Sequence, residues 1–252
     1  EAEAAYRQAI ALAPDFAEAY SNLGNVLSGL GRLDDAEACL RQALVLQPDL
    51  AEANYNLGIV LEDKGLLLAA EACLRQAIAH RPHYAQAYSN LSGVLLKQSR
   101  IEVAESCLRQ ALLIGVELAS IHSNLLFCLA HRAGLSPAEL FAEHLRFGEQ
   151  FEAPLRAGWQ PHPNDRHPDR PIRVGLVSGD LRNHAIAHFL EPLISPLAAL
   201  APQAGLVLVA YSNHATEDHI TQRLKGYFAE WHNIAALTDA ALAEQVRADH
   251  ID

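Results

Sequence analysis

Two different patterns of apolar residues divide the chain. From residue 1 to about residue 146, apolar residues recur every three or four positions, the spacing of helices that bury one face. After residue 170, short and nearly continuous apolar runs such as PIRVGLVS and GLVLVAYS alternate with helical patterns. Such runs are typical of parallel strands covered on both faces. The pattern therefore predicts an all-helical part followed by an α/β part.

The helical part is built from a repeat of 34 residues. Three segments start with similar sequences at residues 17, 51 and 85, a partial segment precedes them, and a drifted fourth one starts at residue 119. Each segment contains two amphipathic helices, and the second helix of the fourth is predicted to begin near Ser136-Pro137. The period and the residue types resemble tetratricopeptide repeats, which stack helix pairs into a superhelix with a concave groove. This part predicts a protein or peptide partner.

The four cysteines follow the repeat and do not form a cysteine motif of their own. Cys39, Cys73 and Cys107 are 34 residues apart, and Cys128 has a different phase. Equal spacing predicts one small apolar core position used three times, since a disulfide framework or a zinc site uses other spacings. A reducing cytoplasm is the expected compartment.

Charge and hydropathy exclude two classes of partner. The formal net charge is -11, so no basic surface is expected for a nucleic acid. The apolar runs are read as too short and too interrupted by charges to span a membrane. The first residue is Glu1 and the sequence contains no methionine, so the chain is interpreted as a fragment of a longer protein.

One polar position of the repeat predicts a binding function. An asparagine occupies the sixth place of every segment, in the first helix, which lines the groove. Asparagine is a mediocre helix former, whereas its amide both donates and accepts hydrogen bonds. A row of amides could hold an extended peptide backbone, or it could merely join neighbouring helices. Lysine or arginine, which carboxylate clamps of this fold use, is missing from the adjacent places, and this disfavours a chaperone-tail adaptor. The row consists of Asn22, Asn56, Asn90 and Asn124.

A proline-rich stretch separates the two parts. Residues 147–170 contain four prolines and are predicted to form an extended connector, because proline and the residue before it avoid helix. The predicted domains are therefore the repeat array at 1–146, the connector at 147–170 and an α/β part at 171–252. In that part the sequence SGDLRNH follows the first strand, and ligands of parallel sheets gather at such strand ends.

The whole chain resembles the SPINDLY / O-linked N-acetylglucosamine transferase family. The resemblance rests on the repeats, the asparagine row, the ending ALAEQVRADHID and a stretch of the form R-[IV]-G-x-V-S-x-D-x-x-x-H, which begins at Arg173 and ends at His184. It implies a multidomain protein: an all-α tetratricopeptide superhelix followed by a partial, Rossmann-like N-terminal lobe of a GT-B glycosyltransferase. The family inverts the sugar linkage, uses no metal or other cofactor, and takes a nucleotide sugar as substrate. Its uridine and diphosphate sites lie mainly in a second lobe that this sequence does not contain.

His184 and His188 admit three interpretations. As a pair four residues apart they could bind a metal, but no glutamate or third ligand accompanies them, so no metal site is predicted. His188 is expected to be a structural histidine on the helix face that packs on the sheet. His184 starts the helix, whose free N–H groups and dipole attract anions. The resemblance places it in the active site, as general base or as substrate positioner.

The neighbours of His184 complete the predicted site. Ser178, Asp180 and Asn183 form the donor-site neighbourhood, with Asp180 more simply explained as a helix cap. The glycines Gly175 and Gly179 are expected where backbones approach closely. Asp249 and His250 are expected at the surface.

The resemblance implies a protein O-glycosyltransferase in the cytoplasm. It would transfer N-acetylglucosamine from UDP-GlcNAc to serine or threonine of proteins held in the groove, and the fragment alone is expected to be inactive. A fucosyltransferase that uses GDP-fucose is one alternative, and a non-catalytic repeat scaffold that binds peptides is another. A nucleotide-binding enzyme of the Rossmann type is disfavoured, because no G-x-G-x-x-G follows the first strand.

Overall fold

The computed structural model describes residues 1–115, 118–162 and 164–252. Within this part the chain forms two compact units, Glu1–Gly158 and Trp159–Asp252, and each is described by itself. Val116 and Glu117, at the end of the third predicted segment, lie outside the described residues. The same holds for Pro163, one of the four connector prolines.

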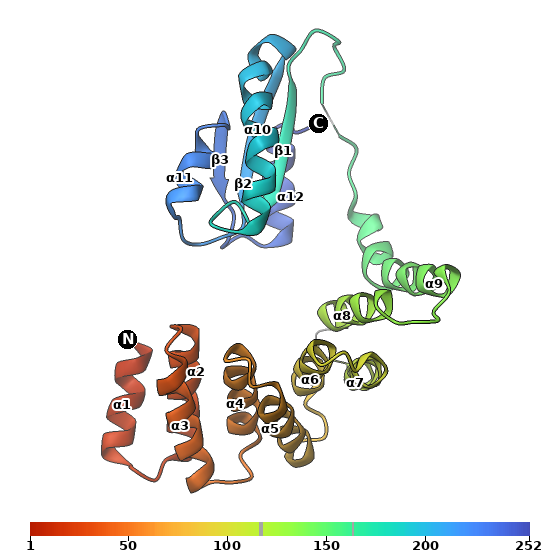
Figure 1. The fold of residues 1–252 in the computed structure, drawn as a ribbon. Coiled ribbons are helices and arrows are strands. Elements are labelled where there is room, and N and C mark those ends of the chain that lie inside the picture. The colour runs from red at the N-terminus through yellow and green to blue at the C-terminus, as the bar shows by residue number, and fades with distance from the viewer. Residues whose placement is uncertain (116–117, 163) are drawn as a thin grey trace. The chain divides into compact units, whose positions relative to one another are not determined.

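The first unit is an array of antiparallel helix pairs, as the 34-residue period predicts (Figure 1). A single helix precedes three complete pairs, and the drifted fourth segment forms one more pair. Each helix packs on its partner and on the helices of the next segment. The helices are α1 (Ala2–Leu12), α2 (Ala17–Gly29), α3 (Leu33–Leu46), α4 (Ala51–Asp63), α5 (Leu67–His80), α6 (Ala85–Lys97), α7 (Ile101–Ile114), α8 (Leu118–Ala130) and α9 (Pro137–Phe147).

Small residues let the two helices of a pair approach each other. Gly58 of α4 faces Leu74 of α5, and a Cβ atom on Gly58 would lie only 2.7 Å from the Cγ atom of Leu74. Ala70, one turn before Leu74, is fully buried in the same contact. The cysteines are unpaired thiols in this core, half-buried or buried, and burial raises the pKa of each thiol. The repeated cysteine position is therefore structural, as its spacing predicts.

The last repeat continues into the predicted connector. The hydroxyl of Ser136 caps α9 by accepting from the backbone N–H of Glu139, and the Glu139 carboxylate accepts from the backbone N–H of Ser136, so the predicted helix start is confirmed. After α9 the chain forms a π-helical turn (Gly148–Glu152) and a 3-10 helix (Ala153–Gly158). The prediction of an extended segment is wrong for these residues. Pro154 lies in the first turn of the 3-10 helix, where a missing N–H costs nothing.

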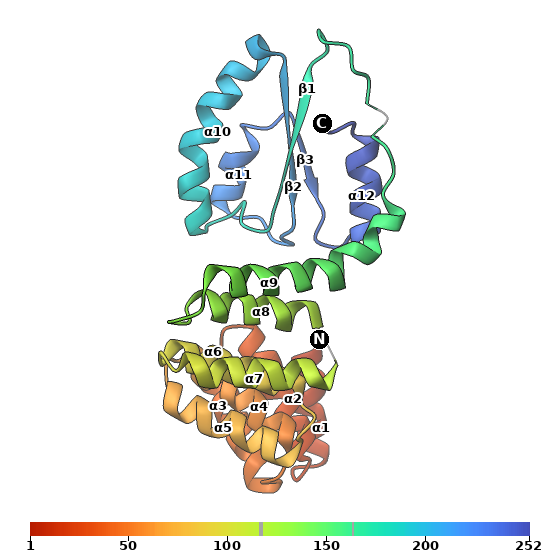
Figure 2. The same cartoon turned by 90° about the vertical axis from the view of Figure 1, so that its right-hand side faces the viewer.

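The second unit is a small parallel sheet between helices. Among the described residues its strand order is β1-β2-β3, and all neighbours are parallel. Figure 2 shows α10 and α11 on one face of the sheet and α12 on the other, the arrangement that right-handed crossovers produce. The elements are β1 (Ile172–Ser178), α10 (Ala185–Ala204), β2 (Leu206–Ser212), α11 (His219–Lys225), β3 (Glu230–Asn233) and α12 (Asp239–Ala248).

Helix α10 is longer than the sequence suggests. It continues without interruption through Pro192, Pro196 and Pro202, although a proline inside a helix normally ends or kinks it. Pro192 and Pro196 lie four residues apart on the exposed side of the helix, where water reaches the carbonyls that lose an N–H donor. The opposite side places Ile194 and Ala201 against the sheet, and this packing outweighs the poor helix propensity of proline.

The length of α10 contradicts the expectation that every apolar run is too short to span a membrane. Ala185–Ala204 has 20 residues, and an 18-residue window of it has a mean hydropathy of 1.3, so by length and composition it could cross a membrane. It packs on β2 through Ile194, however, and its Glu191 forms an ion pair with Arg223 of α11 at 2.6 Å. These contacts describe a helix that covers a sheet.

Candidate functional site

The loop between β1 and α10 brings the predicted site residues together. His184 is the N-cap of α10: its backbone is extended, and its ring Nδ1 accepts a hydrogen bond from the N–H of Ile186 at 3.3 Å. The Asp180 carboxylate lies 3.6 Å from the same nitrogen. Ser178 Oγ accepts from the N–H of Asp180 at 3.0 Å, so the loop is folded around these side chains. His184 and Asp180 are each about one third exposed.

Two expectations about this motif are wrong. Asp180 does not cap α10, because the ring of His184 does so itself. His188 is exposed, since Ala187 and Leu190 are the residues of this turn that pack on the sheet. The two histidines do not share a helix face, because the backbone of His184 is not helical. Among the described residues, no group of three or more His, Cys, Asp or Glu side chains is arranged to hold a metal ion.

A second loop, between β2 and α11, holds the first one in place. Asp218 caps α11 and also accepts a hydrogen bond from the backbone N–H of Asn183 at 2.7 Å. Backbone hydrogen bonds from Thr221 and Asn183 lower the pKa of Asp218 to about 2. The sequence analysis did not select Asp218. Its sequence, TED at residues 216–218, follows the second strand and is a helix-start signal, because threonine and aspartate are favoured before the first residue of a helix. Asn183 is therefore anchored through its backbone.

Close contacts with neighbouring atoms explain the two glycines near the site. A Cβ atom on Gly179 would lie 3.3 Å from the carbonyl oxygen of Asn213, and one on Gly175 would lie 3.0 Å from Ile251. Both distances are tighter than ordinary van der Waals contact. The expected close approach of backbones is confirmed at Gly179, whereas the contacts at Gly175 are with the side chains of Ile251 and Tyr211.

A polar cluster lies on the α12 side of the sheet. Tyr211 is fully buried, and its hydroxyl donates to Asp249 at 2.6 Å. Burial and this carboxylate raise the pKa of Tyr211. The ring of His232 stacks on Tyr211, and Arg173 binds Glu230 through two hydrogen bonds of 2.8 Å. Asp249 is thus partly buried, with 20% of its side chain exposed, so the expectation of a surface residue is not met for Asp249, whereas His250 is exposed as expected.

The asparagine row makes hydrogen bonds between repeats. Each side-chain amide from the second repeat onward donates from Nδ2 to a hydroxyl of the preceding repeat. The amide oxygens accept no hydrogen bond among the described residues. The row therefore joins neighbouring helices and still offers acceptors to a ligand. The pairs are Asn56 with Ser21 at 3.5 Å, Asn90 with Tyr55 at 3.1 Å, and Asn124 with Ser89 at 3.1 Å.

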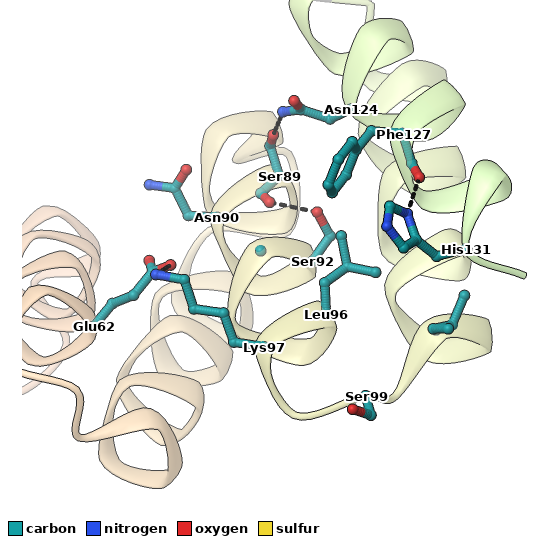
Figure 3. Close-up of a pocket in the computed structure, with 12 residues that line it drawn as sticks. Glu62, Ser89, Asn90, Ser92, Leu96, Lys97, Ser99, Asn124, Phe127 and His131 are labelled. Carbon is teal, nitrogen blue, oxygen red and sulfur yellow. Dashed lines mark hydrogen bonds and ion pairs between the residues drawn. The ribbon is translucent and has the colours of Figure 1, made fainter. Parts of the chain in front are cut away.

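The row borders a pocket between α6 and α8, about 620 Å3 in volume (Figure 3). Ser89, Asn90 and Asn124 contribute to its lining, together with Lys97 and other residues that sequence reasoning missed. The groove thus contains a cation outside the places adjacent to the row. Lys97 pairs with Glu62 at 2.9 Å and is not a free carboxylate clamp.

Comparisons with known proteins find similarity to tetratricopeptide-repeat proteins and to glycosyltransferases that carry such repeats. Tetratricopeptide-repeat patterns match residues 1–31, 17–50 and 67–115. The probable UDP-N-acetylglucosamine–peptide N-acetylglucosaminyltransferase SPINDLY of Oryza sativa subsp. japonica is 30% identical over 120 residues, 45% of this chain and 12% of that protein. A mutant of Thermobaculum terrenum O-GlcNAc transferase matches in structure with a TM-score of 0.77 and 30% identity, over 94% of this chain and 44% of that one.

The chain carries tetratricopeptide repeats and is related to SPINDLY and O-GlcNAc transferase. YrrB, a tetratricopeptide protein whose structure is described with an unusual peptide-binding site, matches with 25% identity and a TM-score of 0.52, over 61% of this chain and 78% of that one. The chain spans less than half the length of the transferase and about an eighth of the SPINDLY protein.

Proposed function

We propose that this chain is the acceptor-binding array and part of the N-terminal catalytic lobe of a protein O-glycosyltransferase. The observation that carries the proposal is the match to an O-GlcNAc transferase over 94% of the chain, which includes the sheet unit as well as the repeats. The parallel order β1-β2-β3 with helices on both faces supports a Rossmann-like lobe of the GT-B type. In this proposal residues 1–146 bind the acceptor, 147–170 connect, and 171–252 begin the catalytic domain.

The loop at His184 supports a donor-side role. It lies after the carboxyl end of β1, next to the loop that follows β2, where parallel sheets bind their ligands. Ser178, Asp180 and Asn183 shape it through the contacts described above. The reaction would need a partner for the departing nucleotide diphosphate and a group that orients the acceptor hydroxyl. His184 is the side chain of this loop that we assign to the reacting groups.

The hydrogen bond at Nδ1 favours a positioning role for His184. Because Nδ1 accepts from the N–H of Ile186, the proton of the neutral imidazole sits on Nε2. Nε2 then donates a hydrogen bond and cannot take a proton from a serine or threonine hydroxyl. In this arrangement His184 binds an oxygen of the substrate and does not act as the general base.

The activity is tested with the full-length protein that contains these residues. Incubated with radiolabelled UDP-GlcNAc or GDP-fucose and serine- and threonine-rich acceptor peptides, it is expected to label the peptide from UDP-GlcNAc. His184→Ala should reduce kcat/KM about 100-fold or more, the loss typical of one transition-state contact. His188→Ala is the matched control, since this exposed histidine lies four residues away, and it should leave the rate unchanged. Equal rates for both variants would exclude His184 from the site.

A second substitution separates the two roles of His184. The side-chain amide of His184→Gln can donate from about the position of Nε2 but cannot act as a base. A positioning role predicts that this variant keeps most of the activity that His184→Ala loses. Loss equal to that of His184→Ala, with a pH–rate profile that no longer has the wild-type acidic limb, would instead establish the base.

The asparagine row supplies the acceptor side of the proposal. Amide oxygens without a hydrogen-bond donor, repeated once per segment, can accept from the backbone N–H groups of an extended polypeptide whatever its side chains. Asn90→Ala together with Asn124→Ala should raise the KM for a peptide acceptor with little change in kcat. The same variant should not change hydrolysis of the nucleotide sugar by water.

A non-catalytic scaffold is the alternative, and the likeness to YrrB favours peptide binding in its own right. It predicts that the full-length protein binds peptides and transfers neither sugar. Transfer from GDP-fucose alone would establish the fucosyltransferase alternative.

A further inference from the structure

The groove of the third and fourth repeats contains a side-chain pocket. One position on the groove side of each first helix is Asn25, Ile59, Gly93 and Phe127 in successive repeats. Gly93 leaves space in the floor of the pocket, and a Cβ atom there would meet only Glu62 Oε1, at 3.7 Å. Phe127, which is 61% exposed, forms the facing wall. The missing side chain in one repeat and the aromatic ring in the next together create the pocket.

The walls of the pocket suit an aromatic group. The rings of Phe127 and His131 lie 4.5 Å apart between centroids and form one side, while Leu96 and Ile101 add aliphatic surface (Figure 3). Offset aromatic pairs at such distances attract each other beyond the effect of burial. A planar ring inserted from the groove would contact Phe127 and cover apolar surface that is now open to water.

The polar atoms at the rim of the pocket determine which hydrogen bonds a ligand can make there. His131 Nδ1 lies 2.8 Å from the carbonyl oxygen of Phe127, which can only accept, so Nδ1 carries the proton and Nε2 of the neutral ring is an acceptor. The amide oxygens of Asn90 and Asn124 are further acceptors. Lys97 is held by Glu62 and leaves the pocket without an unpaired charge of its own. The rim thus accepts hydrogen bonds, from a phenol hydroxyl as well as from backbone N–H groups.

Charge indicates the rest of the occupant. Residues 1–158 contain 19 Asp and Glu against 12 Lys and Arg. Glu18 and Asp63, on the first helices of the first two repeats, are exposed and have no ion-pair partner among the described residues. Asp63 has the same place in its repeat as Lys97 in the next. A polypeptide that enters the pocket and extends over the first repeats would therefore be matched by basic side chains.

We propose that the pocket at Gly93 and Phe127 binds an aromatic side chain, tyrosine above all, of a basic polypeptide lying along the asparagine row. The inference rests on the proposed acceptor role of the groove and adds selectivity to it. The row holds any backbone, and the pocket selects those polypeptides that present a ring at this repeat.

The test is a binding measurement on the whole 252-residue chain. Two fluorescein-labelled 14-residue peptides of serine, threonine and lysine are used, identical except for tyrosine or alanine at the centre. The tyrosine peptide is expected to bind about tenfold more tightly, the effect of one buried aromatic anchor. Replacement of the lysines by glutamates should weaken both peptides.

The Gly93→Ile variant tests whether the pocket causes the difference in affinity between the tyrosine and alanine peptides. Isoleucine is the natural residue at this place in the second repeat, and it would fill the pocket without touching the amides. It should lower the affinity of the tyrosine peptide to that of the alanine peptide and leave the alanine peptide unchanged. Gly93→Ala, which adds only a methyl group, is the control and should keep most of the preference. Both variants should melt at or above the wild-type temperature, since glycine in a helix interior is unfavourable.

The outcomes separate the two proposals. Equal binding of both peptides, reduced by Asn90→Ala with Asn124→Ala, overturns the pocket and leaves the asparagine row intact. A tyrosine preference that survives Gly93→Ile also overturns the pocket. Absence of measurable binding for either peptide overturns the acceptor role of the groove itself.

Discussion

The two units reach a stable core by opposite routes. In the repeat unit, Ala36, Ala70 and Ala104 occupy the same place in successive repeats, and each is fully buried. In the sheet unit every core position is used once, and strands joined by long crossovers must meet before any of them is buried. The outer side of α10 still exposes Phe189 at 77% and Leu193 at 71%. Neighbouring repeats supply each other's packing, whereas a sheet depends on contacts distant in the chain.

The largest effect expected is a core cavity in the repeat unit. Leu74→Ala removes a fully buried side chain that lies against Gly58, and it should lower the free energy of unfolding of that unit by about 3 kcal/mol. The control is Leu68→Ala in the same helix, whose side chain is 79% exposed.

The two units can be followed separately. Both tryptophans, Trp159 and Trp231, belong to the sheet unit, whereas most helix belongs to the repeats. Leu74→Ala should therefore shift denaturation measured by helical circular dichroism and leave the fluorescence transition in place. A shift of equal size in both signals would show that the units unfold together.

A smaller effect is expected from the buried hydrogen bond of the sheet unit. Tyr211→Phe keeps the ring and removes the hydroxyl that donates to Asp249, so it should cost about 1–2 kcal/mol. The loss should be visible in the fluorescence transition and absent from the circular dichroism of the repeats. An unchanged midpoint would mean that the hydroxyl contributes nothing to folding.

A turn of the repeat unit should gain stability. Ser99 has a φ of 60°, a left-handed conformation, where the first two repeats have Gly31 and Gly65 with φ of 75° and 76°. Ser99→Gly should raise the free energy of unfolding by about 1 kcal/mol, because glycine adopts this conformation without a steric penalty. The reverse change, Gly31→Ser, should lower it by a similar amount. Denaturant midpoints by circular dichroism provide the measurement.

The smallest expected effect is on the stability of the sheet unit at acidic pH. The pKa of Asp218 is lowered to about 2 in the folded unit, below the value of about 4 for an unfolded aspartate. Its contribution to stability is therefore present above pH 4 and is lost as the pH falls from 4 to 2. Asp218→Asn keeps a helix cap but does not titrate, so its sheet unit should lose less stability over this interval. Parallel acid transitions of variant and wild type, followed by fluorescence, would contradict this prediction.

Much of the repeat unit could be read from the chain itself. The 34-residue period located the helix pairs, and Ser136-Pro137 marked the start of α9. Such features are predictable because helix pairs form from residues close in sequence. The connector was read less well, since Pro154 is compatible with the first turn of a 3-10 helix and does not by itself indicate extended chain.

The candidate site was only partly predictable from the sequence. The strand end at SGD was correctly expected to open a loop before a helix. The pattern did not reveal that Asp218, 35 residues after Asn183, anchors that loop, or that the ring of His184 caps its own helix. The catalytic assignment of His184, Ser178, Asp180 and Asn183 and the peptide role of the asparagines remain predictions that the variants above address.

The sequence by itself determined the period of the array, the switch from helical to alternating elements, and the likeness to SPINDLY and O-GlcNAc transferase. Tertiary structure alone decided that α10 runs through three prolines, that His188 faces outward, that Asp249 binds the buried Tyr211, and that Gly93 and Phe127 line a pocket. The physical reason is that a sequence pattern reports on single elements, whereas these four features depend on contacts between residues distant in the chain. Periodicity reports which face of an element is apolar, whereas the partner of a side chain depends on the element that the fold brings against it.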